Sequence, residues 1–209
     1  MKLFTLTLKA FQFEELSEQA KKKAIEDNRN FNVDGYSWHE FLYEHWTDEL
    51  AKNGFLKAKV YHSGFWSQGD GASFDAEIDL DFFLKQKKYR RLKRVQDYLY
   101  TAIKTNQYAT HYCHEKTRYA VIYLEGACGP SANDPAINEL INQLEADVEQ
   151  SRLDFSKRIY KDLEETYDSL TGDEAVSESL IANEEDFLED GSLLAGHRIN
   201  YQDLQPIAA

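Results

Sequence analysis

The segment LKAKVYHSGFWSQGDGASFDAEIDL, residues 56–80, organises the rest of the chain. Before its glycines, apolar residues alternate with lysines from Leu56 to Val60. After them, apolar residues alternate with acidic or hydroxyl side chains from Ala72 to Leu80. A period of two is the pattern of a half-buried β-strand. Two such strands joined by a glycine-rich connection predict an antiparallel hairpin with a long loop, Gly64–Gly71.

Further elements are predicted on both sides of this hairpin from the spacing of apolar residues. The predicted helices cover residues 17–31, 38–50, 87–105, 137–167 and 173–183. The further predicted strands cover residues 2–10, 107–113 and 118–125. Consecutive strands lie close enough in the chain to pair antiparallel, and no repeated alternation of strand and crossover helix occurs.

The sequence therefore predicts an α+β fold, with an antiparallel sheet of about four to five strands packed with helices. A long acidic C-terminal helical element is added to it. Glycines and prolines gather in residues 126–135, which is typical of a joint between domains. We expect an α+β core domain over residues 1–128. The acidic helical element is expected over residues 129–209, packed on the core or projecting from it.

Composition limits the class of protein. The chain has 209 residues, of which 42% are hydrophobic, and its many aromatic residues argue against disorder. Two cysteines imply no disulfide framework. No stretch approaches the roughly 20 apolar residues that a membrane-spanning helix requires. A cytoplasmic protein without a membrane partner is expected.

The net charge of −13 conceals an uneven distribution. Between Lys85 and Lys104 there are eight basic residues and one acid, a net charge of +7. Between Asp134 and Asp190 there are 18 acids and four basic residues, a net charge of −14. Such asymmetry is informative about partners rather than about fold.

Four segments resemble one family of proteins. They are Phe13–Ala24, Trp38–Tyr43, Ser63–Phe74 and Ile181–Gly191. Together they are similar to a widespread family of uncharacterised bacteriophage and prophage proteins, members of which are sometimes labelled antitoxins of toxin–antitoxin systems. The resemblance implies a small phage-encoded accessory protein acting in the cytoplasm of the bacterial host. It implies no reaction and no site residues.

The glycine-rich loop has two interpretations. As a ligand site, backbone N–H groups around Asp70 would meet an anion, Trp66 would offer a stacking surface, Gln68 would read polar groups, and His62 would be the nearest titratable partner. As a structural turn, the glycines supply positive φ angles, Asp70 caps the turn, and an aromatic residue anchors the loop. The spacing matches neither a Walker loop nor the dinucleotide-binding fingerprint.

Other charged and reactive patterns favour structural roles. A row of acids on one predicted strand could hold a cation, but such rows more often form the solvated face of a sheet and pair with neighbouring lysines. His111 and Cys113 lack the further ligands of a zinc site. The basic segment Lys85–Lys104 could contact phosphates, yet the protein as a whole is acidic, so direct nucleic-acid binding is not expected. We predict no metal, no cofactor and no catalytic residue, hence no enzyme.

The acidic third of the chain is the stronger indication of a partner. Carboxylates can occupy a basic channel where phosphates would lie, and long-range attraction speeds association. The alternative is a solvated face that only keeps the protein soluble. The predicted partner-binding acids are Asp147, Asp154, Asp162, Glu164, Glu165, Asp168, Glu184, Glu185 and Asp186.

These observations lead to one leading hypothesis and two alternatives. The leading hypothesis is a non-enzymatic phage protein that binds and blocks a host factor, a protein or protein–nucleic-acid complex of a CRISPR or restriction defence system. The first alternative is a ligand- or nucleotide-binding or enzymatic module centred on the Gly64–Phe74 loop. The second is an antitoxin that neutralises a cognate toxin. A homodimer through the long C-terminal helix is a further expectation.

Overall fold

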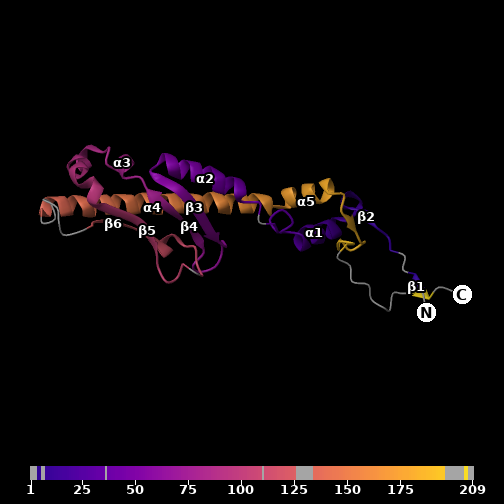
Figure 1. Cartoon of the computed structure of the whole chain (residues 1–209). Coiled ribbons are helices and arrows are strands. Elements are labelled where there is room, and N and C mark those ends of the chain that lie inside the picture. Colours follow the sequence, from indigo (N-terminus) through magenta and orange to yellow (C-terminus); the bar gives the residue numbers. More distant parts are fainter. Residues whose placement is uncertain are drawn as a thin grey trace. The chain divides into compact units, whose positions relative to one another are not determined.

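The computed structural model describes residues 4–5, 8–35, 37–109, 111–125, 134–195 and 205–206. The chain divides into two compact units: unit 1 combines Met1–Trp38 with Thr166–Ala209, and unit 2 is His39–Glu165. Helices and strands are both present, which confirms the α+β class (Figure 1). The domain boundary predicted between residues 128 and 129 lies outside the described residues. No helix of the described chain is long and apolar enough to cross a membrane.

The predicted hairpin is confirmed in unit 2. Strands β3 (Phe55–Ser63) and β4 (Gly71–Ile78) pair antiparallel on either side of the glycine-rich loop. Phe55 and Phe74 are fully buried and meet edge to face, with ring centroids 5.2 Å apart. Helix α2 (Glu40–Lys52) lies along β3. The buried apolar residues of α2 are Leu42, Trp46 and Leu50, as their helical spacing predicts.

The segment that follows the hairpin corrects the prediction. After the short helix α3 (Leu80–Phe83), the 3₁₀ segment η2 (Lys87–Tyr98) leads into strand β5 (Leu99–Thr105), which pairs with β6 (Arg118–Leu124). The helix predicted over residues 87–105 is therefore wrong beyond residue 98. The strand predicted over residues 107–113 is also wrong, because its described residues form turns and coil. Aromatic and β-branched residues pair well across strands, which outweighs a weak helical spacing.

The expected sheet of four to five strands is not formed. Among the described residues, β3–β4 and β5–β6 are separate two-stranded ladders, although β4 and β5 lie next to each other. The buried guanidinium of Arg118 bridges the two hairpins instead of a backbone ladder. It donates to Ser73 Oγ and to Asp75 Oδ1, each at 2.7 Å, and lies 4.2 Å from the centre of the Tyr61 ring. Side-chain bonding thus replaces strand pairing between the hairpins.

Helix α4 (Pro135–Leu170) forms the long predicted helix, and its residues up to Glu165 belong to unit 2. Two of its carboxylates protect the free edge of β6. Glu149 accepts the backbone N–H of Ala120 at 2.8 Å, and Glu145 accepts that of Ile122 at 2.7 Å. Unpaired N–H groups of an edge strand otherwise invite pairing with another chain. The apolar stripe of α4 is buried within this chain: Ile137, Ile141, Leu144, Val148, Phe155, Ile159 and Leu163.

Unit 1 brings together segments from both ends of the chain. Helix α1 (Glu18–Asp27) and helix α5 (Asp173–Ala182) enclose an apolar core. The 3₁₀ turn η1 (Phe13–Glu15) contributes to the same core. Strands β2 (Phe11–Gln12) and β7 (Asp186–Phe187) pair antiparallel beside it. The buried core residues are Phe13, Leu16, Ala20, Ala24, Val176, Leu180 and Phe187. Strands β1 (Phe4–Thr5) and β8 (Gln205–Pro206) also pair antiparallel.

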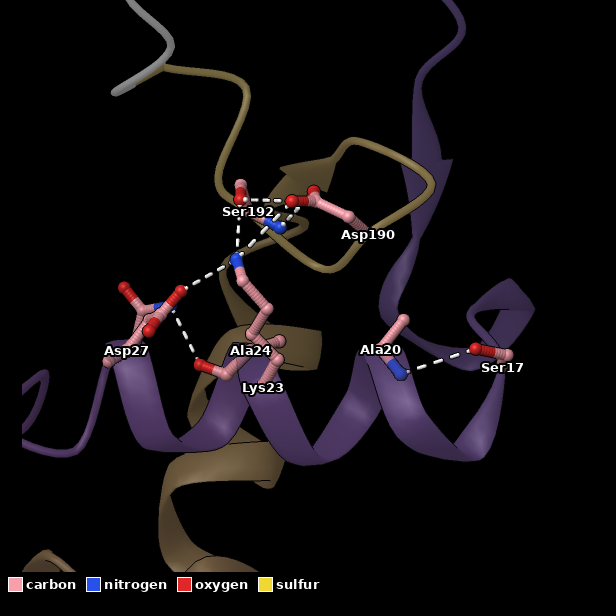
Figure 2. A network of polar contacts seen from close by, with 8 residues as sticks. Ser17, Ala20, Lys23, Ala24, Asp27, Asp190 and Ser192 are labelled. Atoms are coloured by element: carbon pink, nitrogen blue, oxygen red, sulfur yellow. Dashed lines mark hydrogen bonds and ion pairs between the residues drawn. The ribbon is translucent and has the colours of Figure 1, made fainter.

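The turn after β7 is fastened to α1 by one lysine. Lys23 Nζ donates to Ser192 Oγ at 2.6 Å and to Asp27 Oδ2 at 2.9 Å, and it lies 3.5 Å from Asp190 Oδ2 (Figure 2). Gly191, with φ +88°, packs so closely on α1 that a methyl group there would overlap the carbonyl oxygen of Ala20. The two family-like segments Phe13–Ala24 and Ile181–Gly191 are therefore neighbours in the fold.

Candidate interaction site at the hairpin loops

The Gly64–Phe74 loop is closed by its own carboxylate. Asp70 Oδ2 accepts the backbone N–H of Trp66 at 3.0 Å and that of Ser67 at 2.6 Å. A Cβ atom on Gly64 would lie 2.6 Å from this oxygen, so glycine leaves the room that the carboxylate occupies. These two N–H groups hold an internal anion rather than an external one.

The other two glycines bring a second loop into contact. A Cβ atom on Gly69, which has φ +96°, would lie 2.5 Å from the ring of Tyr112. A Cβ atom on Gly71 would lie 2.8 Å from the backbone of His114. The N–H of Cys113 also donates to Ser63 Oγ at 3.3 Å. The glycines therefore position the β3–β4 loop against the β5–β6 connection.

Large aromatic side chains project from both loops into solvent. Trp66 is 73% exposed, Tyr108 57% and Tyr112 44%. We refer to these three residues as the aromatic tip. The second loop is braced, because Asn106 accepts the N–H of Tyr108 at 2.9 Å and donates to the carbonyl of Lys116 at 2.9 Å. The tip thus presents aromatic groups on ordered backbone.

Helix α4 contacts the Gly64–Phe74 loop through Tyr160. The Tyr160 hydroxyl donates to the carbonyl of Phe65 at 3.2 Å, and the two rings lie 5.7 Å apart. Burial raises the pKa of Tyr160, and the nearby negative charges of Glu164 and Asp70 add to the effect. Glu164 follows Tyr160 by four residues on α4, so the two side chains share one face of the helix.

His62 lies beneath the loop, half-buried and facing α2. Its ring stacks on Phe65 with centroids 6.0 Å apart, and its Nδ1 is 2.6 Å from the Tyr43 hydroxyl. Burial, with a smaller contribution from His39, lowers the pKa of His62 to about 4. Burial raises the pKa of Tyr43 to about 12. Both groups are therefore neutral at neutral pH and anchor the hairpin to α2.

Acidification should destabilise the wild type more than a His62→Gln variant. The unfolded chain binds a proton at His62 near the ordinary pKa of 6.5, whereas the folded chain binds it only near about 4. Between these values the unfolded state carries more protons, so the free energy of unfolding falls as the pH falls. His39, whose pKa burial also lowers, is retained in both proteins. Urea denaturation at pH 7, 5.5 and 4.5 measures the difference, and parallel profiles would contradict it.

The structure separates the four residues of the predicted ligand site. Trp66 and Gln68 are exposed, while the Asp70 carboxylate turns back to the loop backbone. His62 faces Tyr43 on α2. Of the two interpretations of the loop, the turn geometry accounts for all its glycines and for Asp70. Trp66 and Gln68 are the members that a partner would meet.

The predicted acidic residues have unequal roles. Asp147 accepts from Lys88 and from the Tyr89 hydroxyl, Asp154 accepts from Gln150, Glu165 pairs with Lys161, and Asp186 accepts from Gln12. The remaining five form no ion pair with another described residue: Asp162, Glu164, Asp168, Glu184 and Glu185. They are divided between the units, since those from Asp168 onward belong to unit 1.

The acids of the β4 strand and its end all have partners. Asp75 bonds Arg118, Glu77 bonds Lys57, Asp79 caps α3, and Asp81 accepts from Gln96. The described residues contain no group of three or more potential metal ligands. The arrangement of this row matches the interpretation of a solvated, paired strand face.

Three residues of the site were missed by the sequence analysis. Tyr108 and Tyr112 fell in a segment predicted as a strand, and Tyr160 fell in the apolar pattern of α4. The glycines of the first loop and the tyrosines of the second are the only local signals, and they do not show that the loops touch.

The comparisons with known proteins place the chain in a family without assigning an activity. Residues 38–173 match the family described as domain of unknown function DUF8835, and the chain belongs to that family. The match covers all of unit 2 and therefore the whole aromatic tip. No curated protein matches the chain. No solved structure matches it either.

Proposed function

We propose that this chain is a phage-encoded accessory protein of the bacterial cytoplasm that binds and blocks a host factor and catalyses no reaction. The factor proposed is part of a nucleic-acid-targeting defence system of the CRISPR or restriction type. The observation that carries the proposal is the aromatic tip, in which exposed Trp66 lies on a loop held by Tyr160 of α4, with Glu164 one helical turn further along the same helix.

Exposed tryptophan and tyrosine on ordered loops are typical of binding surfaces. Trp and Tyr are enriched among the residues that contribute most to protein–protein affinity, because they bury a large area and lose little conformational entropy. Asp70 and the bonds of Asn106 order the two loops in advance, which lowers the entropy cost of binding. No catalytic group is needed for such a role.

The acidic surface supplies the second part of the proposal. Asp162, Glu164 and Glu165 follow Tyr160 on α4, the helix that holds the tip loop. Carboxylates beside an aromatic anchor suit a partner whose nucleic-acid channel is basic, and they speed its association. Asp147 contributes less to this surface, because Lys88 and Tyr89 already bond it. The finer proposal is therefore acidic mimicry centred on the residues of α4 next to the tip.

The structure argues against the first alternative function, a nucleotide site, and leaves the second, an antitoxin, to experiment. A nucleotide site at the loop would need N–H groups for its phosphates, and those of Trp66 and Ser67 are bonded to Asp70. An antitoxin would use the same surface, so the identity of the captured partner separates it from an anti-defence protein.

Replacing Trp66 by alanine should weaken partner binding about 30-fold, the effect of losing an anchor worth about 2 kcal/mol. Phe41, 58% exposed on α2, provides the matched control Phe41→Ala, for which we expect little change. The measurement combines affinity capture from host cells with plating of a phage that CRISPR or restriction targets. The intact protein and Phe41→Ala should rescue plating, and Trp66→Ala should not. Equal behaviour of both variants would contradict the proposal.

Charge is tested by a second comparison. Neutralising Glu164, Glu165 and Asp168 together should slow association severalfold at low salt, and the effect should shrink at high salt. The control neutralises Glu14, Glu44 and Asp48, three exposed acids that belong to η1 and α2 rather than to α4. If both triple variants bind as the wild type does at every salt concentration, mimicry is excluded.

A further inference from the structure

The basic residues of η2 are sorted into rows by its 3₁₀ geometry. A 3₁₀ helix has three residues per turn, so side chains three apart lie above one another. The first row, Tyr89, Leu92 and Val95, is buried. The second row meets acids near or on α4: Lys88 bonds Asp147, and Arg91 and Arg94 lie 3.8 Å and 3.2 Å from Asp134.

The third row of η2 faces solvent. Lys87, Arg90 and Lys93 are exposed, and none forms an ion pair with any described residue. At about 2 Å of rise per residue, these cations follow one another at about 6 Å. A regular line of unpaired cations suits a regular polyanion.

A tyrosine-rich face begins five residues after this row. On one side of the β5–β6 ribbon lie Tyr100, Tyr119, Tyr123 and Lys104, because residues two apart in a strand and residues directly opposite in an antiparallel pair share a face. Tyr98, the last residue of η2, directly precedes β5. Tyr98 is 53% exposed, and Tyr119 and Tyr123 are each 42% exposed. Tyr100 and Tyr123 stack with ring centroids 4.8 Å apart, and Lys104 lies 5.7 Å from the Tyr100 ring. The opposite side of the ribbon supplies buried Ala120 and Ile122.

We infer that this face binds single-stranded nucleic acid, with bases stacked on the tyrosines and phosphates on the basic row. Single-strand binding surfaces combine aromatic platforms with cations that track the backbone. If the ligand of this face were an acidic protein, the basic row would be explained but the stacked tyrosines would have no role. From Lys93 to Tyr98 the chain rises only about 10 Å, within reach of a few nucleotides. The inference is independent of the proposed blocking function and uses different residues.

The sorting of charge explains why the total charge is a poor guide here. Three of the six η2 cations within Lys87–Arg94 are paired with Asp147 and Asp134, and the other three form no ion pair with a described residue. The binding face is thus locally basic in a protein of net charge −13.

The test is fluorescence polarisation of the full chain with a labelled 20-nucleotide single strand, as DNA and as RNA, and with the matched duplex. Binding to a single strand should exceed binding to the duplex. Three phosphate contacts should give a log–log salt dependence with a slope of about −2. Equal affinity for the duplex, or no binding at low salt, would overturn the inference.

Two sets of variants test whether single-strand binding uses the basic row of η2 and the tyrosines of the β5–β6 ribbon. Lys87→Glu with Arg90→Glu and Lys93→Glu should lower affinity at least tenfold, whereas reversal of Lys9, Lys22 and Lys157, which changes the net charge equally, should lower it less than threefold. Tyr100→Ala with Tyr123→Ala should lower affinity about tenfold, and the corresponding Phe variants should retain it because they can still stack. Equal losses in both charge-reversal variants, or capture of a polyglutamate peptide in place of the oligonucleotide, would refute the proposal.

Discussion

Replacing Gly191 by alanine should destabilise unit 1 by about 2–4 kcal/mol. Gly191 has φ +88°, which costs a residue with a side chain about 1 kcal/mol. A Cβ atom would also overlap the carbonyl oxygen of Ala20, and crowding of this kind costs about 1–3 kcal/mol. The crowded atom belongs to the backbone of α1, so no flexible side chain can move aside (Figure 2). The bonds of Lys23 to Ser192 and Asp190 should be strained together with the turn.

Chemical denaturation and amide hydrogen exchange of α1 and α5 measure the effect. The matched control is Gly35→Ala, because a Cβ atom there meets nothing closer than 3.6 Å. We expect the control to lie within about 0.5 kcal/mol of the wild type. Unchanged exchange in α1 and α5 of Gly191→Ala would show that the turn is not packed as described.

Replacing Glu149 by leucine should cost about 3–5 kcal/mol, because it leaves a buried cation without its partner. The Arg152 side chain is fully buried, and it donates from Nε and Nη2 to the two Glu149 oxygens at 2.8 Å and 2.7 Å. No described group bonds its Nη1. Glu149 also accepts the N–H of Ala120, so its loss leaves an edge donor of β6 unpaired.

A second substitution separates the two contributions. Glu149→Leu combined with Arg152→Met removes the buried charge and should recover most of the lost stability, with the unpaired Ala120 N–H left as a cost of about 1–3 kcal/mol. Glu139→Ala, on the exposed side of the same helix, should have little effect. Urea denaturation measures all three variants. A double variant no more stable than Glu149→Leu would show that the guanidinium is not the source of the effect.

The elements with strong periodicity could be predicted from the sequence. The β3–β4 hairpin alternates without interruption from Ala72 to Leu80, and α4 repeats apolar residues over many turns. Residues 99–105 were wrongly predicted as helical, because Leu99 and Ile103 fit a helical stripe as well as one face of a strand. Their pairing with β6 decides the outcome, and that contact is not local.

The segments that come together in unit 1 could not be predicted either, because their contacts are also not local in sequence. Phe13 and Phe187 are far apart in sequence and meet edge to face with centroids 6.0 Å apart. Each segment carries too few apolar residues to identify its partner. At the candidate site, Trp66 was identified from its conspicuous loop. Tyr112 and Tyr160 were not, because their positions depend on how the β5–β6 connection and α4 fold against that loop.

Photo-cross-linking from position 66 tests the central claim, that the aromatic tip and the α4 carboxylates after Tyr160 bind a host partner. A benzoylphenylalanine at Trp66 and, in a separate protein, at Phe41 would be activated in host cells. We expect a discrete adduct with a nucleic-acid-handling host protein from position 66 only, and we expect Glu164→Gln with Glu165→Gln to weaken it. No adduct from position 66, or the same adduct from position 41, would contradict it.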